Sequence, residues 1–206
     1  PSLIFIAYPN NPTGVCFKRE EVEAVVRAAT GIVVVDEAYG AFHHDSFLPW
    51  AGEVENLVVM RTISKIGFAG LRMGYAAASP GIIGELAKIL PPYNMNQLSL
   101  AAAKFSLKHH PIIQQNIDTL KNERSRVMNE LSKLNRLQVF PSEANFITVR
   151  VPDADELFET LKQNRIVIKK LHGSHPLLDQ CVRITIGSAA QNDAVLAVIK
   201  NLYPNL

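Results

Sequence analysis

The sequence has little of several features that mark whole classes of protein. It contains two cysteines and one tryptophan in 206 residues, and its formal net charge is only +2. Cys16 and Cys181 lie far apart and belong to no CxxC or other metal-type spacing, as expected for reduced thiols in a cytoplasmic protein. No apolar run reaches the ~18 residues that a membrane-spanning helix needs, and no Lys/Arg cluster suggests nucleic-acid binding. The sequence therefore predicts neither a membrane nor a nucleic-acid partner.

What is present is typical of a globular α/β protein. Apolar residues make up 48% of the chain and charged residues 19%, which argues against a disordered chain. A chain of this length can bury roughly 70% of its unfolded surface in a core. The sequence opens with Pro1 and a short apolar run at residues 3–7, and we expect no signal peptide. Because such a run is typical of a buried strand, we expect the chain to be a piece of something longer.

Strands and helices alternate along the first half. Strands are predicted at 3–7, 32–35, 56–60 and 75–78, and helices at 19–29, 80–90 and 96–107. The run at 32–35 is entirely β-branched, which is typical of a parallel strand that is covered on both faces. Alternation of this kind predicts a mostly parallel sheet with crossover helices.

The second half has a long amphipathic helix followed by shorter elements. The helix is predicted at 111–134 and later helices at 154–163 and 192–202, with strands at 137–140, 146–149, 166–168 and 182–186. We predict part of a large α/β domain at residues 1–104 and a small α+β domain at 105–206. The fold class is therefore α/β with a mostly parallel sheet, plus a small α+β C-terminal domain.

Polar residues follow three of the predicted strands, where ligands bind in open α/β sheets. Asn11 follows the first strand and Asp36-Glu37 the second, with Tyr39 close behind, while the third is followed by Thr62, Ser64 and Lys65. Each feature also has an ordinary structural explanation. Asn11 lies in a turn-rich segment, a carboxylate after a strand is often a helix cap, and Ser64-Lys65 could be plain surface.

Four motifs in fixed order give a more specific indication. They are Pro9-Asn10-Asn11-Pro12-Thr13-Gly14, Val35-Asp36-Glu37-Ala38-Tyr39, Arg61-Thr62-Ile63-Ser64-Lys65 and Gly70-Leu71-Arg72-Met73-Gly74-Tyr75. With Cys181-Val182-Arg183-Ile184-Thr185-Ile186-Gly187 near the C-terminus, the chain resembles the fold-type I aminotransferases of classes I and II, which use pyridoxal 5'-phosphate. Within that family it is most similar to the histidinol-phosphate branch.

The resemblance implies a role for each matching residue. Lys65 would form the internal Schiff base with the cofactor and then shuttle the proton, as the catalytic residue. Asp36 would pair with the pyridine nitrogen and so let the ring accept electrons. The remaining predicted cofactor contacts are Asn11 and Tyr39 at the ring oxygen, and Thr62, Ser64 and Arg72 at the phosphate. Arg183 would bind the substrate's anionic group, and Glu37 is expected to be structural.

The resemblance also implies substrates and partners. The expected reaction exchanges the amino group of L-histidinol phosphate with 2-oxoglutarate, and the intact chain is expected to be a homodimer. Alternatives are a threonine-phosphate decarboxylase-like lyase, another class I or II aminotransferase, and a non-catalytic fragment. Many relatives carry an arginine where this chain has Lys169-Lys170, and the sequence leaves open which lysine, if either, meets a substrate phosphate. His172 and His175 have no third ligand, so no metal site is predicted.

The family has a long segment before the point where this chain begins. That segment supplies further contacts to the cofactor. We therefore expect the chain to correspond to the C-terminal portion of the family's chain, to bind the cofactor weakly on its own and to turn over poorly.

Overall fold

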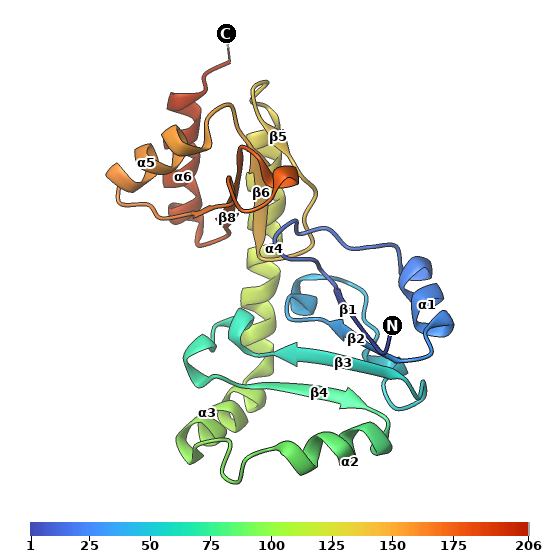
Figure 1. Cartoon of the computed structure of the whole chain (residues 1–206). Helices are drawn as coiled ribbons and strands as arrows, with labels where there is room; N and C mark the ends of the chain where they lie inside the picture. Colours follow the sequence, from blue (N-terminus) through green and yellow to red (C-terminus); the bar gives the residue numbers. More distant parts are fainter. Residues whose placement is uncertain (206) are drawn as a thin grey trace. The chain divides into compact units, whose positions relative to one another are not determined.

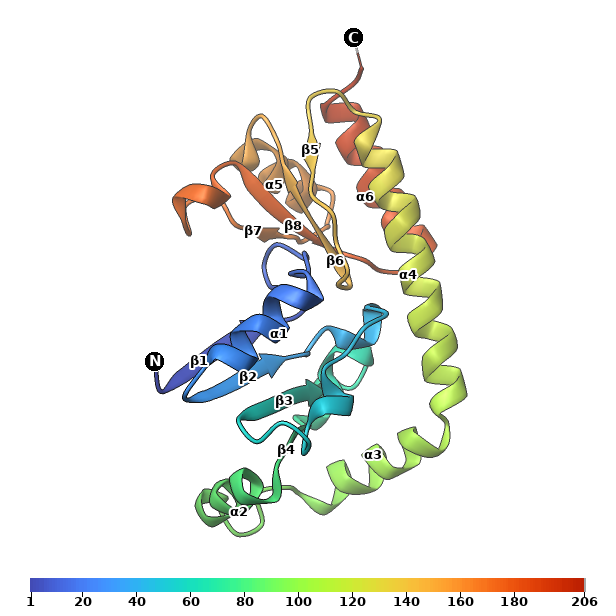
Figure 2. The same cartoon turned by 90° about the vertical axis from the view of Figure 1, so that its right-hand side faces the viewer.

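The computed structural model describes residues 1–205, which form two compact units. The first consists of Pro1–Asn10 and Cys16–Ile117, and the second of Asn11–Val15 and the chain from Asp118 onward. Figure 1 and Figure 2 show the elements from two directions. The predicted division between residues 104 and 105 falls inside helix α3 (Gln97–Lys108), and two separately folding domains stay a prediction.

The first unit is built on a four-stranded sheet. Its strands are β1 (Leu3–Ala7), β2 (Ile32–Asp36), β3 (Leu57–Thr62) and β4 (Gly74–Ala78), in that spatial order. The first three run parallel, and β4 pairs with β3 in the antiparallel sense. The predicted α/β class is confirmed, with its parallel strands adjacent to one another.

One face of this sheet is covered by helix α1 (Arg19–Ala28). Val22 and Val26 are four residues apart and so lie on one side of the helix, where they pack on Val33, Val35 and Val59. Figure 2 shows α1 beside β1 and β2. Helices α2 (Pro80–Ile89) and α3 follow β4. Helix α4 (His110–Ser132) begins in the first unit and ends in the second.

The second unit contains an antiparallel sheet. Its spatial order is β5 (Gln138–Val139), β6 (Phe146–Arg150), β8 (Cys181–Thr185) and β7 (Lys169–Lys170). Helices α5 (Ala154–Gln163) and α6 (Ala189–Leu202) contribute to its core. The core side chains that the sheet and these helices share are Ile147, Val149, Val182, Ile184, Leu157, Leu161, Leu196 and Ile199.

Two predicted boundaries in this unit were wrong. The strand expected at 166–168 lies at Lys169–Lys170, because pairing with β8 begins only at Lys169, although Ile166 and Ile168 do pack against the core. Helix α6 begins three residues earlier than predicted. Ser188 accepts a hydrogen bond from Gln191 N, and Gln191 Oε1 accepts one from Ser188 N, which is a capping box.

The short segment Asn11–Val15 belongs to the second unit although residues on both sides of it belong to the first. Gly14 has φ +79°, and a Cβ there would lie 2.5 Å from Ser142 Oγ, so only glycine fits the position. Its carbonyl accepts a hydrogen bond from Glu143 N at 2.8 Å. Thr148 Oγ1 also donates to the Pro12 carbonyl. The segment is thus fixed against β6 and the loop that precedes it.

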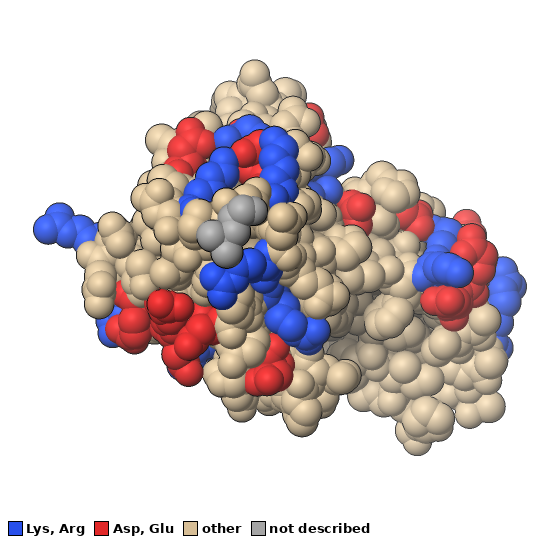
Figure 3. All heavy atoms as spheres, turned by 90° about the horizontal axis from the view of Figure 1, so that it is seen from above, with Lys and Arg blue, Asp and Glu red and all other residues tan. Residues whose placement is uncertain are grey.

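Charged side chains of both signs alternate on the surface of the second unit, and Figure 3 shows this around the C-terminal end. Arg126 pairs with Glu123 and Asp193, and Glu130 pairs with Lys133 and Lys200. In the part of the chain that is described, no helix is both long and apolar enough to cross a membrane.

Acid should weaken the contact between α4 and α6. Hydrogen bonds from Lys133 and Lys200 lower the pKa of Glu130 from 4.5 to about 2. Because the folded pKa lies below the unfolded value, this stabilisation is complete above pH 4.5 and is lost as the pH falls towards 2. The midpoint of urea unfolding should therefore drop between pH 6 and pH 3, and the drop should be smaller in Glu130→Gln. Glu159→Gln is the control, since its carboxylate faces only Lys162, within one helix at 3.7 Å. An equal drop in Glu130→Gln and the unaltered chain would contradict the prediction.

Candidate active site

The candidate site lies at the carboxyl edge of the parallel strands. Asp36 is the last residue of β2 and Thr62 the last of β3. Asp36 is paired with Met60, so these ends lie side by side. The Asp36 Oδ1 atom accepts a hydrogen bond from Ala38 N at 2.9 Å, whereas Oδ2 has no hydrogen-bond partner among residues 1–205. One carboxylate oxygen is thus held by the backbone and the other can accept from a ligand.

Lys65 and Tyr39 come together from neighbouring strand ends. Lys65 lies in the 3₁₀ turn Ser64–Ile66 that directly follows β3, and its side chain is half-buried. Tyr39 follows β2 and is 8% exposed. The Lys65 ammonium group lies 5.3 Å from the centre of the Tyr39 ring, within the range of a cation–π contact. The turn after β3 therefore directs the amine towards the end of β2.

Thr62 and Ser64 form a hydroxyl pair next to Lys65. The Thr62 Oγ1 atom lies 2.9 Å from both Ser64 Oγ and the Met73 carbonyl, and it accepts from Ser64 N at 3.1 Å. These contacts fix the turn that carries Lys65 against the segment before β4.

Arg72 has a left-handed backbone, with φ 55°, a conformation that costs a non-glycine residue free energy and is concentrated at functional sites. Its exposed guanidinium donates only a long hydrogen bond, 3.3 Å, to the Ala69 carbonyl. No hydrogen bond joins Arg72 to Thr62 or Ser64 within the described residues. Most of its donors are therefore open to an anion.

The other two predicted site residues lie in the second unit, where they contact each other. Arg183 is on β8, and its Nη1 donates to Asn11 Oδ1 at 2.5 Å. Its guanidinium carbon is 4.9 Å from the centre of the Phe146 ring. The Arg183 Nε atom is buried and has no hydrogen-bond partner in the described structure. Stacking and one bond to Asn11 hold this side chain, and several of its donors remain for a ligand.

The register of β7 places the two lysines that the sequence left open on opposite faces of the sheet. Lys169 is directly opposite Arg183, so the two side chains lie on the same face of the sheet. Lys170 points to the other face, where it pairs with Asp155 of α5 and lowers the pKa of that carboxyl. Lys169 is exposed and has no ion-pair partner among the described residues. The Arg183 face therefore carries two cations side by side.

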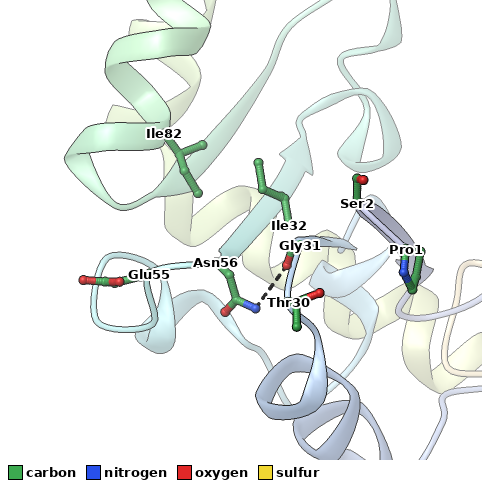
Figure 4. Close-up of a pocket in the computed structure, with 8 residues that line it drawn as sticks. All are labelled: Pro1, Ser2, Thr30, Gly31, Ile32, Glu55, Asn56 and Ile82. Carbon is green, nitrogen blue, oxygen red and sulfur yellow. Dashed lines mark hydrogen bonds between the residues drawn. The ribbon is translucent and has the colours of Figure 1, made fainter.

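One hollow of the first unit lies elsewhere. It has a volume of about 600 Å³ and lies at the amino ends of β2 and β3, lined by residues that include Thr30, Gly31 and Asn56. Figure 4 shows Asn56 bonded to the Gly31 carbonyl inside it. The Asn56 amide also donates to the carbonyls of Val26 and Ala29, so its donors are already used. Ligands of parallel sheets bind at the opposite edge, and we place the candidate site there despite the size of this hollow.

The donor set of the first unit suits pyridoxal phosphate. Asp36 Oδ2 can accept from a protonated ring nitrogen, the Lys65 amine can react with an aldehyde, and the Tyr39 phenol can bond a ring oxygen. The hydroxyls of Thr62 and Ser64, with the guanidinium of Arg72, match a phosphate dianion.

Comparisons with known proteins agree with this chemistry. Residues 1–199 match the family described as aminotransferase class I and II. A protein of Neisseria meningitidis serogroup C named histidinol-phosphate aminotransferase is 71% identical over 203 residues, which are 98% of this chain and 56% of that protein. The chain thus spans little more than half the length of that relative.

Two solved structures have the same fold over nearly the whole chain. The histidinol-phosphate aminotransferase of Clostridium acetobutylicum superposes with a TM-score of 0.91 at 28% identity, covering 100% of this chain and 65% of that one. The corresponding enzyme of Sinorhizobium meliloti, solved in complex with pyridoxal-5'-phosphate, gives 0.86 at 27% identity, with coverage of 98% and 58%.

Proposed function

The chain belongs to the class I and II aminotransferases, and on this premise we propose that it acts in amino transfer between L-histidinol phosphate and 2-oxoglutarate, with pyridoxal phosphate as cofactor. The observation that carries the proposal is the contact of Lys65 with Tyr39 at the strand edge that also carries Asp36, whose Oδ2 atom is free to accept a hydrogen bond. The 71% identity to a histidinol-phosphate aminotransferase supports the choice of substrate. A homodimeric enzyme and a cytoplasmic location are part of the proposal.

In the proposed mechanism, each residue of the first unit has a separate task. Bound pyridoxal phosphate supplies an aldehyde that captures amines and a ring that accepts electrons. Asp36 Oδ2 accepts a hydrogen bond from the ring nitrogen and keeps it protonated. Tyr39 donates to the ring oxygen, while Thr62, Ser64 and Arg72 bind the phosphate. Lys65 Nζ would take the proton from the substrate carbon that bears the amine and deliver it to the cofactor carbon derived from the aldehyde, and it would carry the proton the opposite way with the second substrate.

The second unit is proposed to bind the anionic groups of the substrates. Arg183 offers a planar fork that suits a carboxylate or a phosphate, and Asn11 orients it. Lys169 is proposed as the second cation for a dianionic phosphate, because it lies opposite Arg183 on the same face.

The two lysines provide a matched pair of variants. Lys169→Ala should raise the KM for L-histidinol phosphate about 10-fold to 100-fold, since a hydrogen bond to a charged group contributes about 1.5–3 kcal/mol. Lys170→Ala should leave KM unchanged, because that side chain is engaged by Asp155 on the opposite face. Steady-state kinetics with both variants would check this, and equal effects of the two changes would contradict it.

The function itself is tested by mixing the chain with pyridoxal phosphate and following the absorption band of the bound cofactor. The mixture is then reduced with borohydride, and mass spectrometry locates the modified residue. We expect modification at Lys65 and, with both substrates, formation of glutamate. Release of carbon dioxide from threonine phosphate would favour the lyase alternative instead. A chain that takes up no cofactor at Lys65 would contradict the proposal.

A further inference from the structure

Glu37 is a buried acid to which the proposed chemistry gives no task. It is 1% exposed, yet both of its carboxylate oxygens are fully used. Its Oε1 atom accepts from Phe47 N at 2.6 Å, and Oε2 accepts from Arg61 Nε at 2.9 Å and Nη2 at 2.7 Å. Ser46 Oγ donates to the same carboxylate at 2.8 Å and accepts from Arg61 Nη2, also at 2.8 Å. The Glu37–Arg61 pair thus closes a hydrogen-bond network with Ser46 and Phe47.

This pair lies directly behind the candidate site. Glu37 follows Asp36 and is two residues before Tyr39, and Arg61 precedes Thr62. Side chains alternate along a strand, so Arg61 lies on the α1 side with Val59, and Thr62 faces the other way. The Glu37 carboxylate therefore links the end of β2, the end of β3 and the loop that contains Ser46 and Phe47. It does so on the face of the sheet that the proposed cofactor does not occupy.

The turn that carries Tyr39 also packs on this carboxylate. Gly40 N donates to the Glu37 carbonyl at 2.9 Å. A Cβ at Gly40 would lie 3.0 Å from Glu37 Cβ and 3.4 Å from Oε2, so the turn approaches closely because the residue is glycine. The position of Tyr39 is therefore set in part by the Glu37 side chain.

Stability alone does not explain this ion pair, in which Glu37 is buried and the Arg61 side chain is 28% exposed. Desolvating two charges offsets most of their attraction, and apolar side chains of similar volume often stabilise as well or better. A carboxylate with all of its hydrogen bonds made fixes the orientation of the groups that donate to it, because hydrogen bonds depend on distance and angle. One of those partners, Arg61, directly precedes the predicted site residue Thr62, and Glu37 itself directly follows Asp36.

We propose that Glu37 is a positioning residue that, through Arg61, Ser46 and Phe47, holds Asp36, Tyr39 and Thr62 at the separation that pyridoxal phosphate requires. The proposal rests on the proposed function. It predicts that disturbing the Glu37–Arg61 pair loosens the binding of the cofactor and changes its electronic environment, even in variants that remain folded.

The test compares the unaltered chain with Glu37→Gln, which removes the charge, and Arg61→Lys, which keeps the charge but removes the fork. Glu85→Gln is the matched control, since it breaks another ion pair of the first unit, with Lys88 at 2.6 Å within α2. For each chain one would measure thermal unfolding, the Kd for pyridoxal phosphate, the pH dependence of its absorption band, and amide hydrogen exchange at Tyr39 and Thr62.

We expect the Kd to rise about 10-fold to 100-fold in Glu37→Gln and Arg61→Lys, as for a small displacement of site groups. The pH midpoint of the band should move and exchange at Tyr39 and Thr62 should quicken, with no such change in the control. If either variant stays folded and binds with the Kd and pH midpoint of the unaltered chain, the positioning role is wrong, whatever its melting temperature. If the unaltered chain itself takes up no cofactor, the proposed function fails, and this role fails with it.

Discussion

Replacing Lys65 with alanine is expected to lower the rate of amino transfer by about 10⁴-fold, since general acid–base catalysis alone contributes up to about that factor. The amine lies 5.3 Å from the Tyr39 ring, and no other lysine follows the β2 or β3 end. Borohydride reduction in the presence of pyridoxal phosphate should label the unaltered chain and leave Lys65→Ala unlabelled.

Small amines provide the control for this change. If Lys65 transfers a proton, ethylamine in solution should restore part of the rate to Lys65→Ala but add nothing to the unaltered chain. Lys88→Ala should behave as the unaltered chain, because Lys88 lies on the surface of α2 and pairs with Glu85. If Lys65→Ala transfers amino groups as fast as the unaltered chain, the proposed mechanism is wrong. If the substitution changes neither the rate of amino transfer nor the labelling by borohydride, the non-catalytic alternative is favoured.

The second large effect is expected from Arg183→Gln, which keeps a donor for Asn11 but removes the cation. Loss of one partner of a desolvated charge pair costs about 2–5 kcal/mol, so the KM for both substrates should rise by at least about 30-fold. The Kd for pyridoxal phosphate should change far less, because every predicted cofactor contact except Asn11 lies in the first unit and the variant keeps a donor for Asn11.

Arg136→Gln is the control for this variant. It removes a cation of the same unit whose guanidinium carbon is 5.6 Å from the Tyr203 ring, away from the Arg183 face. Substrate kinetics and a cofactor titration distinguish an effect on substrate binding from an effect on cofactor binding. A weaker affinity for the cofactor, with KM unchanged, would show that Arg183 does not bind the substrate.

The sequence predicted the strands around the candidate site because their signal is local. The β-branched run of β2 ends at Asp36, and the motif after β3 places Lys65 one turn beyond the strand. Neighbouring parallel strands end at one edge of the sheet, so the placement of both residues at that edge followed from topology. Their roles as cofactor ligands stay a prediction.

Other features depend on contacts that the sequence does not show. The choice between Lys169 and Lys170 follows from pairing with a strand 12 or more residues away, and a two-residue strand has no periodicity of its own. The Glu37–Arg61 bond joins residues 24 positions apart, so Glu37 was recognised only as structural. The start of α6 could have been found, since Ser188 and Gln191 have capping-box spacing.

The placement of Asn11–Val15 in the second unit has a consequence for synthesis of the protein. The segment leaves the ribosome well before its partner Arg183, which is made 172 residues later. At about 5–20 residues per second this delay is roughly 9 to 34 s. The residues of the first unit that follow Val15 are all made in that interval, whereas the second unit is completed only when Asn11–Val15 meets strand β8.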